Sequence, residues 1–320
     1  MFGTKKERTV YKGILVFFTT ALIVLGIGTW AWQRYHYRPV STGGQQENAV
    51  EAPSSDPVVL AAGDIATCGV KGSEETAAIL GRTEGMILAL GDEAYPSGSV
   101  QEFKECYGTT WGAHRSRTRP VPGNHEYRTP NASAYFEYFG TSAGDPTKGY
   151  YSYDIGTWHV VALNTNCSDI GGCGEDSPEA RWLQADLASN GSICTLAYMH
   201  VPRFSSGTHG SDTAMQTFWR LMAENGVDVV LTGHDHLYER FAPMDANGTK
   251  DEQKGIREFI VGTGGGNVLY NFNNILPTSE ARNNTTFGAL KLILHPAGYE
   301  WDFIPVAGSE FRDMGRGTCH

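Results

Sequence analysis

Short runs of apolar residues recur along the chain after residue 57, and a small polar cluster follows five of them. These five runs cover residues 58–62, 86–90, 120–122, 194–199 and 227–231. Short runs without polar alternation are typical of strands buried on both faces of a sheet. We expect four later runs to add antiparallel or mixed strands, because most of them have no long helix between them. These runs cover residues 158–163, 257–261, 287–294 and 299–304.

Helix-like segments separate several of the runs. They cover residues 73–80, 178–188 and 212–224. Either Ser177 or Asp176 can cap the second segment, and Pro178 suits its first turn. This alternation of buried strands and helices predicts a layered α/β fold around a largely buried sheet.

The N-terminal part of the chain has a different pattern. An uncharged stretch at residues 13–32 is long enough to cross a bilayer as a helix, and Trp30 and Trp32 suit the membrane interface. The basic segment 1–12 before it predicts a cytoplasmic N-terminus. We therefore expect an uncleaved signal anchor and a membrane-anchored, extracytoplasmic domain. The alternative is a cleaved signal peptide and a secreted protein.

The remaining chain divides into a linker, one folded domain and a tail. Residues 33–57 become rich in Ser, Gly, Gln and Pro and indicate a flexible linker. Residues 58–307 form the expected catalytic domain, and residues 308–320 a C-terminal tail. Hydrophobic residues make up 40% of the chain and charged residues 19%, which is typical of a globular protein.

Six cysteines in an exported domain predict disulfides, although six thiols allow 15 pairings. Cys167 and Cys173 flank a Gly-containing loop and form the best local pair. Cys194 lies within an apolar run, so a buried free thiol is the alternative at that position.

The polar residues that follow the five runs carry the candidate chemistry. Ligands of such sheets bind beyond the carboxyl ends of the strands, and here each of the five ends presents Asp, Asn or His. Any one of them alone could be a turn former or a cap, but five together favour a metal site. The candidate ligands are Asp64, Asp92, Asn124, His200, His234 and His236.

The types of these ligands indicate which metals and which reaction to expect. Hard oxygen donors mixed with imidazoles suit zinc, manganese or iron, and the two oxygens of Asp92 could bridge two ions. Two ions can clamp an in-line phosphoryl displacement and generate hydroxide near neutral pH. The net charge of −10 argues against nucleic acid as a partner, so bound cations would have to attract an anionic substrate.

Five sequence blocks in order resemble the calcineurin-like metallophosphoesterases over residues 58–306. The blocks are Gly63-Asp64, Gly91-Asp92-Glu93-Ala94-Tyr95, Gly123-Asn124-His125-Glu126, His200 and Gly233-His234-Asp235-His236. The resemblance implies a layered α/β/β/α fold with a mixed sheet. It also implies hydrolysis of phosphate esters by a binuclear metal centre.

Within that superfamily the chain looks like the small, single-domain purple acid phosphatases. Many members have a ligating His two residues after the first Asp, where this chain has Ala66, and Tyr95 could supply the missing donor. The purple acid phosphatases usually have Gly at this position, so Ala66 also departs from their pattern. By this resemblance the first ion is Fe³⁺ and the second is Zn²⁺, Fe²⁺ or Mn²⁺. The ligands are then Asp64, Asp92, Tyr95 and His236 for the first ion, and Asp92, Asn124, His200 and His234 for the second.

Three further residues are candidates for contact with the substrate. His125 adjoins a predicted ligand, His209 occupies the position of a substrate-contacting His in the family, and Arg203 could contact phosphate. The expected function is a phosphomonoesterase that uses metal-bound hydroxide on a phosphorylated small molecule. The alternatives are a phosphodiesterase or nucleotidase with the same site, and a non-catalytic metal-binding module. No nucleic-acid partner is expected.

Overall fold

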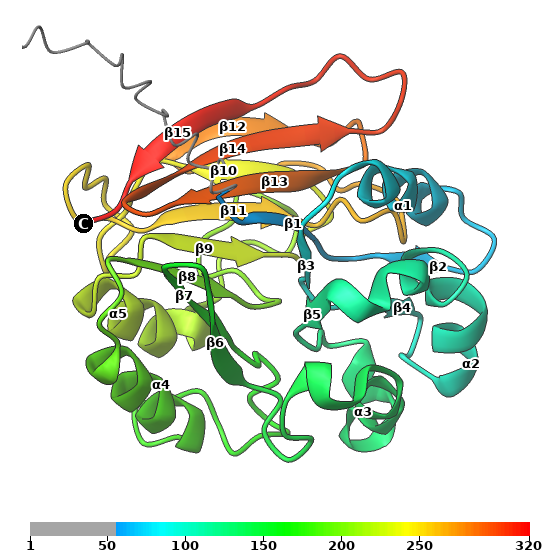
Figure 1. Cartoon of the computed structure of the whole chain (residues 1–320), viewed down its shortest axis with the longest axis horizontal. Coiled ribbons are helices and arrows are strands. Elements are labelled where there is room, and N and C mark those ends of the chain that lie inside the picture. The colour runs from blue at the N-terminus through cyan, green and yellow to red at the C-terminus, as the bar shows by residue number, and fades with distance from the viewer. Residues whose placement is uncertain (1–55) are drawn as a thin grey trace, which may run out of the picture. The chain divides into compact units, whose positions relative to one another are not determined.

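The computed structural model describes residues 56–320 and contains two large β-sheets (Figure 1). The first sheet has the strand order β15-β14-β13-β1-β3-β5. Its strands are β1 (Val58–Ala62), β3 (Met86–Ala89), β5 (Thr118–Pro120), β13 (Gly288–His295), β14 (Gly298–Pro305) and β15 (Met314–Thr318). Strands β1, β3 and β5 run parallel, and the other pairings are antiparallel.

The second sheet has the strand order β12-β10-β11-β9-β8-β7-β6. Its strands are β6 (Tyr151–Ile155), β7 (Trp158–Ala162), β8 (Cys194–Tyr198), β9 (Val229–Thr232), β10 (Tyr238–Phe241), β11 (Arg257–Val261) and β12 (Ser279–Asn283). The four central strands β7, β8, β9 and β11 are parallel, and the remaining strands pair antiparallel at the edges. Both sheets are therefore mixed, as the sequence predicts. A small third sheet pairs β2 (Ala66–Thr67) with β4 (Ala94–Tyr95).

Within the part of the chain that the structure describes, five α-helices accompany the sheets: α1 (Gly72–Arg82), α2 (Val100–Glu102), α3 (Ser133–Phe139), α4 (Pro178–Ser189) and α5 (Gln216–Glu224). Short helical turns add η1 (Phe103–Tyr107), η2 (Trp111–Arg117), η3 (Glu126–Arg128), η4 (Pro130–Ala132), η5 (Gly140–Ala143) and η6 (Thr213–Met215). The hydroxyl of Ser177 accepts from the amide of Ala180, so Ser177 rather than Asp176 caps α4.

Alternation along the strands of the second sheet divides the hydrophobic core into two layers. Val160 and Leu196 lie in the cluster that includes strands of the first sheet, whereas their neighbours Val161 and Ala197 pack with α4 and α5. Aromatic side chains of β14 cross between the sheets, and the ring of Trp301 lies 5.6 Å from that of Phe259 on β11. Helix α1 packs beside β13 on the first sheet (Figure 1). This gives helix layers around two packed sheets, in agreement with the predicted layering.

Three disulfides pair all six cysteines: Cys68–Cys106, Cys167–Cys173 and Cys194–Cys319. The predicted local pair of Cys167 and Cys173 is confirmed. The alternative of a free thiol at Cys194 is wrong, because Cys194 is bonded to Cys319 near the C-terminus.

The segment 308–320 was expected to be a tail, but it contains β15 and the Cys319 bridge. Strand β15 has the sequence Met-Gly-Arg-Gly-Thr at a sheet edge, where exposed and half-buried residues alternate. Because an edge strand buries little apolar surface, its sequence carries no apolar run that would predict it.

The predictions for the N-terminus concern residues that the structure mostly does not describe. The basic segment, the membrane span at 13–32 and all but the last two residues of the linker lie outside residues 56–320. Among the residues described, no helix has the length and apolar character needed to cross a bilayer.

The register of the parallel strands brings the polar residues that follow them to the same edge of the sheet. Ala62 is paired with Ala89, and Ala89 with Pro120, so β1, β3 and β5 end at one level. The two sheets are joined at this edge, where the amide of Gly63 donates to the carbonyl of Val261 at 2.9 Å. The segments that follow the strands of both sheets therefore meet at one place.

Candidate metal centre

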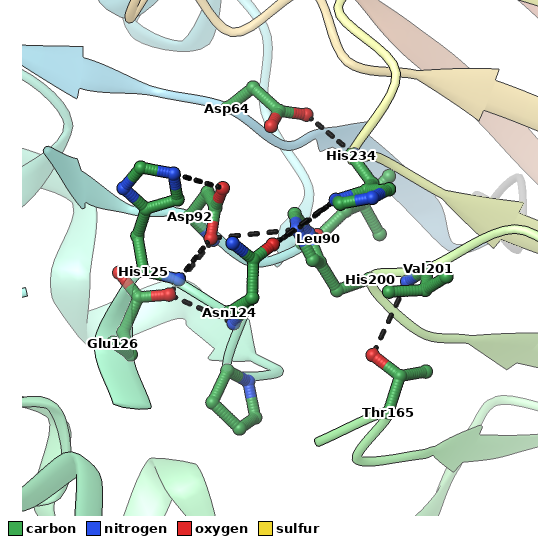
Figure 2. A network of polar contacts seen from close by, with 12 residues as sticks. Asp64, Leu90, Asp92, Asn124, His125, Glu126, Thr165, His200, Val201 and His234 are labelled. Carbon is green, nitrogen blue, oxygen red and sulfur yellow. Dashed lines mark hydrogen bonds and ion pairs between the residues drawn. The ribbon is translucent and has the colours of Figure 1, made fainter. Parts of the chain in front are cut away.

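The seven predicted ligands meet at this shared edge, and their donor atoms form two adjacent groups. Figure 2 shows five of them, Asp64, Asp92, Asn124, His200 and His234. In the first group, Oη of Tyr95 lies 2.7 Å from Oδ1 of Asp64 and 3.0 Å from Oδ2 of Asp92. Nε2 of His236 lies 3.1 Å from Oη of Tyr95 and 3.2 Å from Oδ1 of Asp64. Four side chains from three separate stretches of the sequence thus point at one small volume.

The second group lies on the other side of Asp92. Oδ1 of Asn124 is 3.1 Å from Nε2 of His200 and 3.1 Å from Nδ1 of His234. The two imidazole nitrogens are 3.2 Å apart. Oδ1 of Asp92 completes the group at 3.5 Å from Nε2 of His200. One carboxylate therefore contributes Oδ2 to the first group and Oδ1 to the second.

These separations test whether the residues present fit metal ions. With metal–donor distances of about 2.1 Å, neighbouring donors around one ion lie about 3 Å apart at right angles and about 3.4 Å apart in a tetrahedron. The donor separations in both groups fall near these values. The carboxylates, the phenol and the imidazoles also suit zinc, iron or manganese. The residues present therefore fit two ions that share Asp92.

Backbone carbonyls orient the imidazoles at both groups. Nδ1 of His200 lies 2.8 Å from the carbonyl of Leu90, and Nδ1 of His236 lies 3.1 Å from that of Val268. When Nδ1–H donates to such a carbonyl, the neutral ring presents its Nε2 lone pair to the donor group. The sequence offered no sign of these partners, because they are backbone atoms of distant residues.

Strained backbone marks three of the candidate ligands. Asp64, Asp92 and His234 have φ angles of 62°, 52° and 69°, in the left-handed region that most side chains avoid. Each directly follows a glycine at a strand end. Such conformations cost about 1–3 kcal/mol each and persist where the surroundings hold them in place, most often at functional sites.

Glu126 holds the strand ends together beneath Asp92. Its buried carboxylate accepts from the amides of Asp92, Ala94 and Gly123 at 2.9, 3.2 and 2.8 Å. Burial and then the charge of Asp92 raise the pKa of Glu126 to about 7. A Cβ on Gly123 would lie 2.1 Å from Oδ1 of Asp92, so only glycine allows this approach. Glu126 was part of a recognised block, but its role depends on contacts that the sequence does not show.

The electrostatics of the two groups favour bound cations. Burial and then the charges of Asp64 and Asp92 raise the pKa of Tyr95 well above its usual value, so its ionisation needs a nearby cation. Burial lowers the pKa of His200, but the charge and hydrogen bond of Asp92, the charge of Asp64 and the carbonyl of Leu90 together raise it to about 9. Burial and then the charges of His200 and His209 lower the pKa of His234 to about 3. A bound metal ion would take the place of the protons held by Tyr95 and His200.

His125 and His209 both lie beside the donor groups. The amide of His125 donates to Oδ1 of Asp92 at 2.9 Å, and its Nε2 is 3.7 Å from Oδ2 of the same carboxylate (Figure 2). The exposed ring of His209 stacks on His234, with centroids 4.4 Å apart and planes inclined by 29°. Both positions are compatible with contact to a substrate at the metal centre.

Arg203 makes its contacts elsewhere. Its Nε donates to Oε1 of Gln216 at 2.7 Å, and its guanidinium lies 4.4 Å from the ring centroid of Phe204. These contacts direct Arg203 toward α5, and its predicted role in phosphate binding gains no support from them.

Two residues at the site were missed by the sequence analysis. The ring of Tyr270 stacks on His236 with centroids 4.2 Å apart and planes inclined by 8°. Asp235, between two candidate ligands, accepts from the amide of His209 at 2.9 Å. Tyr270 lies in an irregular segment after β11 that has no apolar periodicity. Asp235 stood within a recognised block, but only the folded loop shows what it contacts.

Comparisons with known proteins agree with this geometry. The family model described as calcineurin-like phosphoesterase matches residues 47–238, which is more than half of the chain. Purple acid phosphatase 22 of Arabidopsis thaliana is 30% identical over 51% of this chain and 37% of its own length. An uncharacterized protein of Mycobacterium tuberculosis is 28% identical over 39% of this chain and 28% of its own length. In both matches, this chain spans well under half of the relative's own length.

Two solved structures share the fold. The purple acid phosphatase PPD1 of yellow lupin superposes with a TM-score of 0.67 at 17% identity, over 83% of this chain and 54% of the lupin chain. GAP50, described as the anchor in the inner membrane complex of Plasmodium, superposes with a TM-score of 0.64 at 13% identity. That match covers 83% of this chain and 90% of the Plasmodium chain. At these identities the likeness concerns the fold alone.

Proposed function

We propose that this chain, which belongs to the calcineurin-like phosphoesterase family, is a binuclear, purple acid phosphatase-like phosphomonoesterase. The observation that carries the proposal is the position of Asp92 between two groups of donor atoms. Its Oδ2 lies 3.0 Å from Oη of Tyr95, and its Oδ1 lies 3.5 Å from Nε2 of His200. Two ions bound there would activate water and neutralise charge on a phosphoryl group.

The two groups differ in charge, and this supports a different ion in each. The first group combines Asp64, Asp92 and the phenol of Tyr95, so it can present three anionic oxygens. These oxygens suit Fe³⁺, the harder and more highly charged ion. The second group shares the Asp92 carboxylate and otherwise offers neutral donors. It suits a divalent ion such as Zn²⁺, Fe²⁺ or Mn²⁺.

Protonation of the leaving group is the step that falls to a side chain. Hydrolysis of a monoester releases an alkoxide, and a nearby acid with a pKa close to neutrality can protonate it. His209 suits this role because its exposed ring stacks on His234, one of the ligands of the second group. His125 is the alternative acid, although its Nδ1 is engaged at 2.6 Å from the carbonyl of Pro96.

We further propose that the domain works outside the cytoplasm, anchored through residues 13–32. The support is the pairing of all six cysteines in disulfides, which persist in oxidising compartments. Full-length protein should remain with membranes after alkaline washing, and external protease should reach the domain in intact cells. Recovery of a soluble chain that starts after residue 32 would instead show a cleaved signal peptide.

The activity is tested on the full chain loaded with iron and zinc. Steady-state rates are compared for an alkyl phosphate, nitrophenyl phosphate and bis(nitrophenyl) phosphate, with Asp92→Ala as the inactive control. The proposal predicts that both monoesters are hydrolysed faster than the diester. A preference for the diester would favour the phosphodiesterase alternative. Two bound ions without any hydrolysis would indicate a metal-binding module.

A further inference from the structure

We propose that Asp235 is a positioning residue, whose carboxylate holds the His209 loop over the metal centre so that His209 can protonate the leaving group. We define the His209 loop as residues 205–210. The proposal rests on the proposed phosphomonoesterase function and on the role of His209 as the acid. It assigns to Asp235 a task distinct from that of its two neighbours, which are candidate ligands.

The contacts of the carboxylate show what it holds. Asp235 is fully buried, and its Oδ1 accepts from the amide of His209 at 2.9 Å. Its Oδ2 accepts from the hydroxyl of Ser205, which in turn accepts from the amide of Gly207 at 2.9 Å. The loop therefore wraps around a single carboxylate, and within residues 56–320 each hydrogen bond that this carboxylate accepts comes from the loop.

The loop can pass this close only because of Gly207. A Cβ at that position would lie 2.6 Å from Cγ of Asp235, which is closer than real Cβ atoms approach. The close passage brings the amide of His209, two residues later, within reach of the same carboxylate. The ring of His209 then extends outward and stacks on His234, with centroids 4.4 Å apart.

Asp235 is itself fixed relative to the candidate ligands. It lies between His234 and His236 in the chain, and its amide donates to the carbonyl of Gly233 at 2.8 Å. The two ligand side chains and the carboxylate that holds His209 therefore belong to one short turn. A side chain in this position can set the distance between His209 and the two groups of donor atoms.

Other contacts hold the opposite end of the loop. The amide of Ser206 donates to Oε2 of Glu239 at 2.9 Å, and the amide of Leu276 donates to the hydroxyl of Ser206 at 2.9 Å. Loss of the Asp235 contacts would therefore release the His209 end while Ser206 stays anchored. This difference separates a positioning role from a general structural one.

The kinetic test uses the full chain with iron and zinc bound. Asp235→Asn keeps the volume but removes the charge and one acceptor oxygen. We expect turnover of an alkyl phosphate to fall about 10²-fold, as small displacements of a catalytic group can cause. Turnover of nitrophenyl phosphate, whose leaving group needs little protonation, should change less than about threefold, and two ions should remain bound. In a His209→Ala background, Asp235→Asn should cause no further loss.

Two variants control this experiment. Ser205→Ala removes one partner of the carboxylate but leaves the amide contact of His209, so its effect should be smaller. Asp212→Asn makes the same chemical change just beyond the loop, where the carboxylate accepts from the amide of Ala214 at 2.8 Å, and turnover should not change. Four results for Asp235→Asn would each overturn the proposal. They are equal losses on both substrates, loss of an ion, unchanged turnover of the alkyl phosphate, and a loss that adds to that of His209→Ala.

A second measurement tests the positioning without activity. Amide hydrogen exchange in Asp235→Asn should speed up at His209 and stay unchanged at Ser206. Unchanged exchange at His209, or equal acceleration at both amides, would overturn the role of Asp235 even if the enzyme is active. If the wild type hydrolyses no phosphate ester, the proposed function fails and the catalytic part of the inference fails with it. If His209→Ala lowers both monoester rates equally or neither, the inference fails while the phosphomonoesterase proposal stands.

Discussion

The phenol of Tyr95 donates to Oδ1 of Asp64 across 2.7 Å, although 31 residues separate them in the chain. This contact brings together the ends of two neighbouring parallel strands. It also places a phenol beside the first predicted ligand, where Ala66 offers no donor atom. The pair therefore gives the proposed iron site a spectroscopic test.

Tyr95→Phe should remove the visible colour of the oxidised protein. A ferric phenolate absorbs visible light through ligand-to-metal charge transfer, and phenylalanine has no oxygen to coordinate. The measurement is an absorption spectrum of the purified full chain beside its iron content, before and after the substitution. A wild-type protein that is colourless, free of iron and fully active would assign Tyr95 to packing and the centre to other metals.

A contact far from the site predicts how stability changes with pH. Nε2 of His159 lies 2.8 Å from Oδ2 of Asp186, and both side chains are mostly buried. The hydrogen bond to Asp186 raises the pKa of His159, although burial opposes it. Because the folded-state pKa is raised, the contribution to stability is fully present below the unfolded value of about 6.5. It is lost as pH rises through the folded-state pKa.

The test compares wild type with His159→Gln by denaturant unfolding between pH 5.5 and 9. The difference in free energy of unfolding should be largest at pH 5.5 and shrink toward pH 9. Asp154→Asn is the matched control, because that carboxylate contacts the other ring nitrogen but is 71% exposed and should contribute less. A difference that grows with rising pH would contradict the assignment.

The disulfides should contribute unequally to stability. Cys194 and Cys319 are 125 residues apart, whereas Cys167 and Cys173 are 6 apart. By the entropy of loop closure, removing the long bridge should lower the free energy of unfolding by ~5 kcal/mol, and removing the short one by ~2 kcal/mol. Paired Cys→Ala variants measured by reversible denaturation test this order. The reverse order would mean that chain entropy does not govern these bridges.

The strands that present the ligands could be predicted because they are short and buried on both faces. The runs at 58–62 and 86–90 correspond to β1 and β3, and the polar residues that follow them lie at the site. The division into two sheets could not be predicted in this way. An apolar run indicates burial, but it does not specify which sheet a strand joins.

Other parts of the fold depend on contacts between distant residues. Phe103 and Tyr107, between β4 and β5, pack against Phe139, which follows β5 in the chain, and the short helices that carry these rings were not predicted. At the site, Tyr270 gave no signal because it lies in an irregular segment, and it meets His236 only through folding. These features are decided by contacts between segments far apart in the chain, which a local sequence pattern does not show.

The metal content of Asp92→Ala tests the proposed binuclear centre most directly. Wild-type chain should bind two ions, measured by elemental analysis after equilibration with iron and zinc. Asp92→Ala removes a donor from both groups at once, so both ions should be lost and turnover should fall by several orders of magnitude. Circular dichroism should show that the fold remains. An Asp92→Ala protein that keeps two ions and near-normal turnover would contradict the assignment of Asp92 as a ligand shared by two ions.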